Sequence, residues 1–330
     1  MKFASIAAIT NHLFGHFGEN PTAVVDDSVR QQFIEHLALY GKSYGTEEEF
    51  EYRLSVFDAN MKFINEHNSR NDGDAQVGIN HMADWSNQEY RRLLGYKPAL
   101  KKRAAPAPKE VNLEDLPDAV NWVEAGAVTP VKNQGMCGSC WAFSTTGAME
   151  GRYQIKSGDL QSFSEQQFVD CSSGEGNQGC NGGLMDLAFQ YAEKNSIDTE
   201  SQYPYKGRDG TCAAVEGVAK VNSFTDVTPK SPSALMAAVA EGPVSIAIDA
   251  GGLAMQFYFG GIIKHFCGTS LDHGVLLVGY GSSKGEDYWL VKNSWGAGWG
   301  EKGFFRIYRD AKEGQAGVCG LQLQPSYPEF

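Results

Sequence analysis

The chain has 330 residues, of which 42% are hydrophobic and 21% charged, and it carries a net charge of −12 at pH 7. This composition is ordinary for a globular protein with a sizeable core, and the negative charge excludes the broad positive field that nucleic-acid binding requires. No stretch approaches the roughly 18 continuous apolar residues of a membrane-spanning helix, so we expect neither a membrane span nor a nucleic-acid partner.

The N-terminal residues, MKFASIAAITNHLFG, combine one early lysine with a short apolar run that Asn11 and His12 interrupt. A positive charge followed by an apolar run is typical of a secretory signal peptide. We expect residues 1–23 to be such a peptide; the alternative is a partly apolar start to a cytosolic chain.

Residues 47–68 contain no helix breaker and repeat six marked residues at separations of 4, 4, 3, 4 and 4. Residues with this spacing share one face of a helix. Because polar side chains stand on that face beside apolar ones, we expect it to make specific hydrogen bonds as well as apolar contacts. The six residues are Glu49, Arg53, Phe57, Asn60, Ile64 and Asn68.

After this helix, GINHMADW leads into KPALKKRAAPAPKEVNLEDLP, which is rich in proline, alanine and lysine. Such a composition is typical of an exposed, extended linker and of a site of proteolytic cutting. The short basic run at 101–103 is expected to be part of this solvated linker. We therefore expect a helical domain over residues 24–100, a linker over 101–115 and a second domain over 116–330.

The second domain is rich in glycine, cysteine and aromatic residues. We expect helices over 139–157, ending at Gly158, over 164–172, starting at Ser164, and over 184–195. Strand-like runs follow at 243–250, 273–281 and 287–295. Helices come first and strands second, which predicts an α+β protein with two lobes.

Cys137 and Cys140 lie three residues apart in NQGMCGSCWAF. They could hold a metal, cycle as a redox pair, form disulfides or provide a nucleophile. A zinc site needs a second close pair of ligands, and the sequence has no second C-x-x-C. A thioredoxin-like pair would follow the first strand of a βαβ unit, whereas the strands come late here. We therefore expect no metal and no cofactor.

Cys140 fits the nucleophile best, because a helix N-terminus and a nearby imidazolium both lower the pKa of a thiol. Cys140 stands at the start of a predicted helix, and His273 opens a predicted strand. Asn293, in LVKNSWGAGWG, carries an amide oxygen that could orient the imidazole. These three residues in these contexts predict a Cys-His nucleophilic site.

With these motifs the chain resembles the papain-family cysteine proteases, most closely their cathepsin L-like branch. The family signature is C-G-[SA]-C-[WY] with His and Asn roughly 130–150 residues later. Here CGSCW is followed by His273 and Asn293 at 133 and 153 residues from Cys140. The resemblance covers about Glu47 to the C-terminus. It implies a papain-like fold, with a helical lobe and a β-barrel-like lobe behind a helical prodomain, and a cysteine endopeptidase made as an inactive precursor.

The resemblance implies five roles in catalysis. Cys140 would be the nucleophile, and His273 would be its ion-pair partner and the proton donor to the leaving amine. Asn293 would orient His273, while Trp295 shields their hydrogen bond from water. Gln134 would donate its side-chain amide to the oxyanion together with the backbone N–H of Cys140.

The seven cysteines are also assigned by the resemblance. It leaves Cys140 free and pairs the others as Cys137–Cys180, Cys171–Cys212 and Cys267–Cys319. Disulfides favour an oxidising compartment. We therefore expect a protein of the secretory pathway, located in a lysosome or vacuole or outside the cell.

For substrate binding, the resemblance implies that Gly183 holds the substrate backbone as an added strand is held. A mostly apolar pocket would take leucine, phenylalanine or valine at the second residue before the scissile bond. Gln324 would form the pocket floor and soften that preference. No added loop blocks the expected cleft, which favours endopeptidase action. The substrate-binding residues implied are Gly183, Leu184, Met185, Ala247, Leu271, Asp272, Gly274, Trp295 and Gln324.

The six residues on one face of the 47–68 helix, here called the helical stripe, match the motif of inhibitory propeptides. GINHMAD resembles the G-x-N-x-F-x-D motif of these propeptides, with Gly78, Asn80 and Asp84 in place. Met82 stands where phenylalanine is usual; since methionine fills the space less rigidly, we expect weaker inhibition. The prodomain would run through the cleft against the substrate direction. We expect acid to protonate carboxylates such as Asp84 and so to release it for cleavage in the linker.

Expected partners are protein and peptide substrates, the chain's own prodomain and cystatin-type inhibitors, and we expect a monomer. Three other functions stay open. A transamidase would transfer the acyl group to an added amine. A peptide-binding protein without activity usually lacks the nucleophile or the histidine, whereas both are present here. A chain that serves as an inhibitor through its prodomain would yield no protease after acid treatment.

Overall fold

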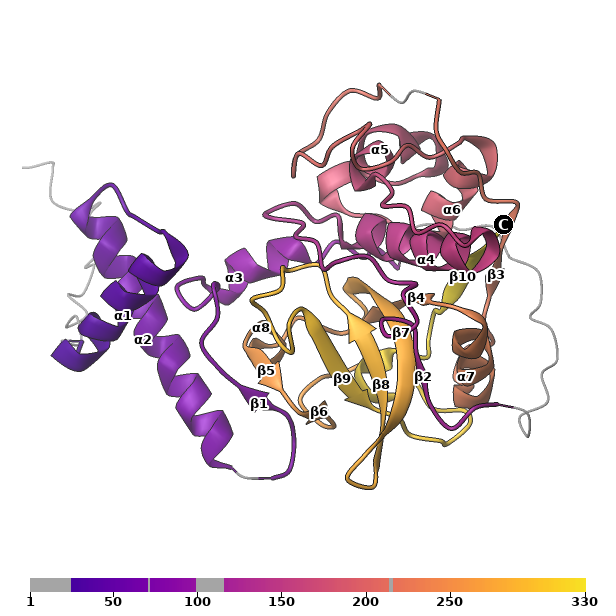
Figure 1. The fold of residues 1–330 in the computed structure, drawn as a ribbon. Helices are drawn as coiled ribbons and strands as arrows, with labels where there is room; N and C mark the ends of the chain where they lie inside the picture. Colours follow the sequence, from indigo (N-terminus) through magenta and orange to yellow (C-terminus); the bar gives the residue numbers. More distant parts are fainter. Residues whose placement is uncertain (1–24, 71, 99–115, 214–215) are drawn as a thin grey trace, which may run out of the picture.

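A computed structural model describes residues 25–70, 72–98, 116–213 and 216–330. The expected signal peptide and the expected linker lie outside these residues. Figure 1 shows a helical N-terminal part beside two lobes, one built around helices α4, α5 and α6 and the other around a twisted sheet. Nowhere in the described ranges is a helix both long and apolar enough to cross a membrane.

The N-terminal part is built on two helices, α1 (Asp27–Tyr40) and α2 (Glu47–Ser69). Thr46 caps α2, since its side chain accepts a hydrogen bond from the Glu49 N–H. Three glutamates in the first turn place negative charge at the positive end of the helix dipole, which also stabilises the helix. The predicted stripe buries Phe57, Asn60 and Ile64. Short elements follow: β1 (Gln76–Val77), α3 (Asn87–Tyr90) and the 3-10 turn η1 (Arg91–Leu93).

The helical lobe contains the three predicted helices. They are α4 (Cys140–Ser157), α5 (Glu165–Cys171) and α6 (Met185–Lys194), with the 3-10 turns η3 (Ser172–Glu175) and η4 (Gly179–Asn181). Helix α4 ends at Gly158, which takes the left-handed conformation that glycine adopts without strain. Ser164 caps α5 by accepting from the Gln167 N–H. Every side chain from Cys140 to Gly151 is buried, because α4 lies between the two lobes.

The second lobe is an eight-stranded sheet, counted over the described residues, with the order β3-β10-β4-β7-β8-β9-β6 and with β2 paired to β7. Its strands are β2 (Val120–Asn121), β3 (Ser223–Asp226), β4 (Val244–Ile248), β6 (Ile262–Ile263), β7 (His273–Ser283), β8 (Glu286–Lys292), β9 (Phe304–Tyr308) and β10 (Ser326–Glu329). Helices α7 (Pro232–Glu241) and α8 (Leu253–Gln256), the turn η5 (Val318–Gly320) and β5 (Tyr258–Gly260), which pairs with β1, complete the lobe.

The expected two-lobed α+β fold is confirmed, and over the described residues the sheet of the second lobe is open and does not form a closed barrel. Closing a barrel requires the first and last strands of the sheet to pair, and in the described part of the chain β3 and β6 have no such pairing. The cause is that β3 belongs to the other core: its Phe224 packs against Phe189 of α6. At the opposite end, β6 has only two residues and pairs only with β9. The sheet is therefore open.

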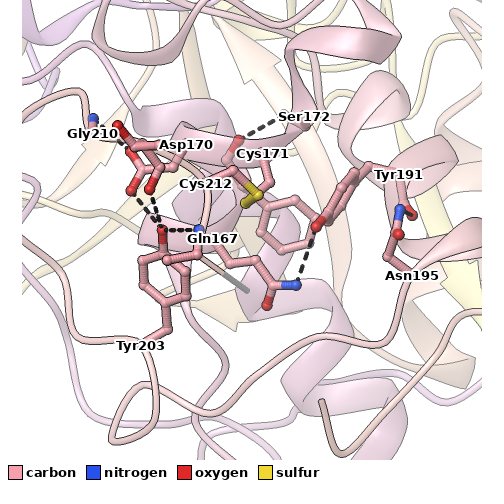
Figure 2. Close-up of a disulfide and its surroundings, with 12 residues drawn as sticks. Gln167, Asp170, Cys171, Ser172, Tyr191, Asn195, Tyr203, Gly210 and Cys212 are labelled. Carbon is pink, nitrogen blue, oxygen red and sulfur yellow. Dashed lines mark hydrogen bonds between the residues drawn. A yellow bond between two sulfur atoms is a disulfide. The ribbon is translucent and has the colours of Figure 1, made fainter. Parts of the chain in front are cut away.

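The described residues contain three disulfides, which join the cysteine pairs that the resemblance implies, while Cys140 is free. Figure 2 shows Cys171–Cys212 at the end of α5, with Asp170 accepting hydrogen bonds from Tyr203 Oη and the Gly210 N–H, both at 2.8 Å. These bonds tie the loop over residues 203–212 to α5.

Candidate active site

The predicted nucleophile and imidazole stand on different lobes. Cys140 opens α4, and His273 opens β7. The two are brought together at the lobe interface, where the backbone N–H of Gly274 donates to Cys140 Sγ at 3.4 Å. Both side chains are fully buried.

The imidazole is held in one orientation. His273 Nε2 lies 2.9 Å from Asn293 Oδ1, and an amide oxygen can only accept, so Nε2 carries the proton. Among the described residues His273 Nδ1 has no hydrogen-bond partner. The Trp295 ring stacks on the imidazole with centroids 4.5 Å apart and covers the bond to Asn293. In the neutral ring, Nδ1 is therefore the basic nitrogen.

Gln134 is buried and its amide is fixed at both ends. Its Oε1 accepts from the Ser294 hydroxyl at 2.7 Å, while its Nε2 donates to the carbonyl oxygens of Leu93 and Cys137, both at 2.8 Å. The side chain therefore presents an N–H to a peptide carbonyl oxygen that enters the site from the N-terminal part.

The N-terminal part covers the cysteine with an extended segment. The Gly95 N–H donates to Cys140 Sγ at 3.3 Å. Gly95 O accepts from the Gly183 N–H at 2.8 Å, and the Lys97 N–H donates to Gly183 O at 3.0 Å, so that Tyr96 and Gly183 form a parallel bridge. The segment lies between the lobes as an added strand.

Several of the predicted pocket residues lie near Tyr96, which is 4% exposed. Leu184, Met185 and Ala247 share its apolar cluster, against which Leu271 packs, and Gln324 Oε1 accepts from the Tyr96 hydroxyl. Two further predicted residues line the site: Asp272 O accepts from the Tyr96 N–H, and a Cβ on Gly274 would meet Met185 Sδ at 3.2 Å. Trp295 contacts the imidazole of His273 and the rings of Tyr90 and Trp299, and its substrate-binding role stays a prediction.

The covered site is electrically neutral. Burial raises the pKa of the Cys140 thiol to about 11, although the N–H groups of Gly274 and Gly95 act in the opposite direction. Burial likewise lowers the pKa of His273 to about 4, against the effect of the Asn293 hydrogen bond. The sequence predicts a thiolate at the helix N-terminus; with the segment in place, burial outweighs that effect and the thiol stays protonated.

The predicted helical stripe binds the segment that follows it. Arg53 forms two 2.7 Å hydrogen bonds to the carboxylate of Glu89 and a third to Glu49. Asn60 donates to the carbonyl oxygens of Ala83 and Trp85 at 2.9 and 3.0 Å, and Asn68 bonds both backbone polar groups of Val77. The stripe therefore supports the 77–89 segment from behind.

The GINHMAD segment is the part that reaches the second lobe. Asn80 Nδ2 donates to Gln256 O at 2.8 Å, and a Cβ on Gly78 would lie 3.1 Å from the Phe259 ring. Met82 is fully buried in the same core as Trp295. The segment is therefore docked on α8 and β5.

The expectation that acid acts through Asp84 is wrong. Burial acts to raise the pKa of this carboxyl, but His36 Nε2 at 3.4 Å and hydrogen bonds from Lys42 and Tyr44 outweigh burial and hold the pKa well below its usual range. Asp84 therefore stays ionised at the mildly acidic pH at which release was expected.

Several contacts of the N-terminal part were missed by sequence reasoning. Asp74 accepts backbone N–H bonds from Lys264 and His265 at 2.7 and 2.8 Å, and Tyr90 Oη donates to Ala250 O at 2.5 Å. These depend on tertiary placement and have no local signal. Glu89 could have been found, because it closes an S-x-x-E capping box with Ser86.

No group of three His, Cys, Asp or Glu side chains in the described ranges is arranged to hold a metal ion. The donors that converge on the cleft are a thiol, an imidazole and two amides. This set is suited to attack on a carbonyl carbon by sulfur.

Comparisons with known proteins agree with this arrangement. The family described as "Papain family cysteine protease" matches residues 116–329, and the "Cathepsin propeptide inhibitor domain (I29)" matches residues 33–90. The chain is 43% identical over 338 residues to "Probable cysteine protease RD21B" of Arabidopsis thaliana, covering 99% of this chain and 72% of that protein. It is 49% identical over 283 residues to "Cysteine proteinase RD21A" of the same plant, covering 84% of this chain and 61% of that protein.

Among solved structures, digestive procathepsin L 3 of Tenebrio molitor larval midgut superposes with a TM-score of 0.82 at 38% identity. The match covers 92% of this chain and 99% of that one. The chain belongs to the papain family of cysteine proteases, in its cathepsin L-like branch, and carries the inhibitory propeptide domain of these enzymes.

Proposed function

We propose that this zymogen matures into an endopeptidase in which Cys140 attacks the scissile carbonyl and His273 transfers the protons. The observation that carries the proposal is the Leu93 carbonyl, whose oxygen accepts from Gln134 Nε2 at 2.8 Å, two residues before the Gly95 N–H that donates to the Cys140 sulfur. A peptide carbonyl in that place stands in for the bond to be cut. Gln134 and the Cys140 N–H would stabilise the oxyanion that forms there.

The reaction proceeds in two halves. The Cys140 thiolate bonds to the carbonyl carbon, and His273 Nδ1–H gives its proton to the departing amine as the C–N bond breaks. Water then attacks the thioester carbon while His273 Nδ1 takes a proton from it, and the C–S bond breaks, which releases the acid and restores the Cys140 thiolate beside the imidazolium. Asn293 contributes by holding Nε2, so that Nδ1 is the nitrogen that faces the chemistry.

Inhibition by the prodomain has two physical parts. The segment from Leu93 to Lys97 fills the cleft, and its parallel bridge to Gly183 supports a chain direction opposite to that of a substrate. The cover also keeps the thiol and the imidazole neutral. Removing it readmits water, and since a charged pair is then favoured by hydration and mutual attraction, the thiolate–imidazolium pair forms.

The pocket around Tyr96 supports an apolar preference at the second residue before the scissile bond. We assign residues 24–100 to the prodomain, 101–115 to the processing linker and 116–330 to the catalytic domain; the family matches over 33–90 and 116–329 support this division. The disulfides favour a secreted, lysosomal or vacuolar location. We further propose that the mature enzyme is a monomer and that cystatin-type inhibitors bind it.

The test is hydrolysis of a fluorogenic Phe-Arg peptide by the purified full chain at mildly acidic pH with a thiol reductant. Activity is expected to rise as a smaller band appears, and the Cys140→Ser variant should remain silent. Equal activity in that variant would overturn the role of Cys140. If neither protein is active, the linker is cut in trans; silence after that cut would show that the chain only binds peptides.

A further inference from the structure

The side chain of Tyr96 fills the specificity pocket of its own enzyme. The aromatic ring lies in the buried apolar cluster that contains Leu184, Met185 and Ala247, and the hydroxyl donates to Gln324 Oε1. The pocket therefore holds a complete tyrosine side chain, with an apolar wall for the ring and a polar acceptor for the hydroxyl.

The hydroxyl is suited to this contact in the buried state. Burial raises the pKa of Tyr96 well above its usual range, so the phenol stays protonated and remains a donor. Gln324 is partly buried, and its amide is uncharged. A carboxylate in its place would attract a basic side chain, whereas a neutral amide oxygen pairs with a neutral hydroxyl.

A substrate can place the same side chain in the same pocket. Tyr96 reaches the pocket from the residue that bridges Gly183, and under the proposed function Gly183 holds the substrate residue two positions before the scissile bond. Reversing the chain direction changes which backbone groups pair with Gly183. It leaves the pocket and its polar end unchanged.

We propose that Gln324 makes this protease select tyrosine over phenylalanine at the second residue before the scissile bond. The proposal rests on the proposed function. Phenylalanine fills the apolar wall equally well but leaves the Gln324 oxygen without its donor, and the net value of one such hydrogen bond corresponds to a roughly three- to tenfold preference in kcat/KM.

The experiment compares three fluorogenic dipeptides with arginine at the cut site and tyrosine, phenylalanine or 4-methylphenylalanine before it. The last has the length of tyrosine without its hydroxyl. The mature wild-type enzyme is expected to prefer tyrosine to both others, and in Gln324→Met the ratio of tyrosine to phenylalanine should fall to about one or below. A wild-type ratio of one, or a ratio that Gln324→Met leaves unchanged, would overturn the proposal.

Two controls separate this proposal from the proposed function. If Cys140→Ser cuts the peptides or the wild type cuts none, the proposed function has failed; if all three are cut at equal rates, only the selectivity has failed. An independent readout uses the full chain. Tyr96→Phe removes the hydrogen bond between the prodomain and Gln324, so this variant should activate roughly three- to tenfold faster than wild type at the same pH. Tyr52→Phe, at a position 47% exposed, is the matched control, and equal rates for the two variants would count against Gln324.

Discussion

The backbones of Gly95 and Gly138 touch beside the nucleophile: a Cβ built on Gly95 would lie 1.8 Å from the carbonyl oxygen of Gly138. No side chain fits between the inhibitory segment and the loop that leads to Cys140. The hydrogen bond from the Gly95 N–H to the sulfur depends on this close approach.

Gly95→Ala should therefore loosen the inhibitory segment. Overpacking of this kind costs about 1–3 kcal/mol, which corresponds to roughly five- to 150-fold greater opening of the cleft. Since Cys140 is the free cysteine of the chain, the rate at which iodoacetamide labels the uncut zymogen measures that opening. Gly45→Ala, where a Cβ meets nothing within 4 Å, is the control, and equal labelling of the two variants would contradict the prediction.

His81 is the group for which we predict an acid response of the prodomain. Burial lowers its pKa to about 4, and Lys42 and His36 act in the same direction while Asp84 opposes them. The ring lies beside Tyr40 and Trp85, and Lys42 Nζ donates to its carbonyl oxygen. Because these neighbours all belong to the prodomain, His81 regains its ordinary pKa of about 6.5 only when the prodomain unfolds on release. The folded, docked prodomain is therefore favoured above pH 6.5 and weakens progressively towards pH 4.

His81→Gln should shift the midpoint of acid activation downward by roughly one pH unit, because the variant gains no proton on release. The measurement is the rate of activation against pH. His265→Gln alters an exposed histidine and should leave the midpoint in place. A midpoint that His81→Gln does not move would assign the acid response to other groups.

Asn293→Ala should lower kcat on the order of 10- to 100-fold, because the imidazole loses the contact that orients it. The Asn293 hydrogen bond raises the pKa of His273. Its loss lowers that pKa, so the imidazolium disappears at a lower pH and the alkaline limb of the pH–rate profile moves downward. Asn195→Ala, at an exposed position, should change neither quantity. A fall in kcat with an unmoved alkaline limb would speak against this hydrogen bond.

A buried ion cluster stabilises the helical lobe beneath the site. Lys132 Nζ lies 2.8 Å from Glu150 and 2.6 Å from Glu165, and both carboxylates are almost fully buried. Lys132→Met leaves them without their cation, which is expected to reduce the free energy of unfolding by about 3–5 kcal/mol. Urea unfolding of the Cys140→Ser zymogen measures this without self-digestion. The control is Lys156→Met at an exposed position, which should reduce the free energy of unfolding by less than about 0.5 kcal/mol. A similar reduction in both variants would contradict a stabilising role of Lys132 in the cluster.

Much of the architecture could be predicted because its signals are local. Gly158 ends α4 and Ser164 begins α5, and the spacing of Arg53, Asn60 and Asn68 places them on one face without knowledge of the partner. The chemistry of Cys140, His273 and Asn293 follows from the residue types and the start of a helix.

The features that could not be predicted have a common physical cause. Asp84 is held ionised by Lys42 and Tyr44, which lie about 40 residues earlier in the chain, and its own surroundings in the sequence give no sign of them. The open sheet follows from the packing of Phe224 in the other lobe. Tyr96 has no feature in the sequence around it that distinguishes it from other tyrosines, since only the folded cleft supplies Gln324.

The covalent link between the prodomain and the cleft that it fills has a kinetic consequence. While the chain is intact, the segment from Leu93 to Lys97 meets its site at an effective concentration on the order of millimolar, whatever the dilution of the protein. A cut in the linker makes the same contacts bimolecular. Release then depends on how dilute the enzyme is, so that a zymogen cut in a crowded vesicle would stay inhibited and become active when its contents are discharged into a larger volume.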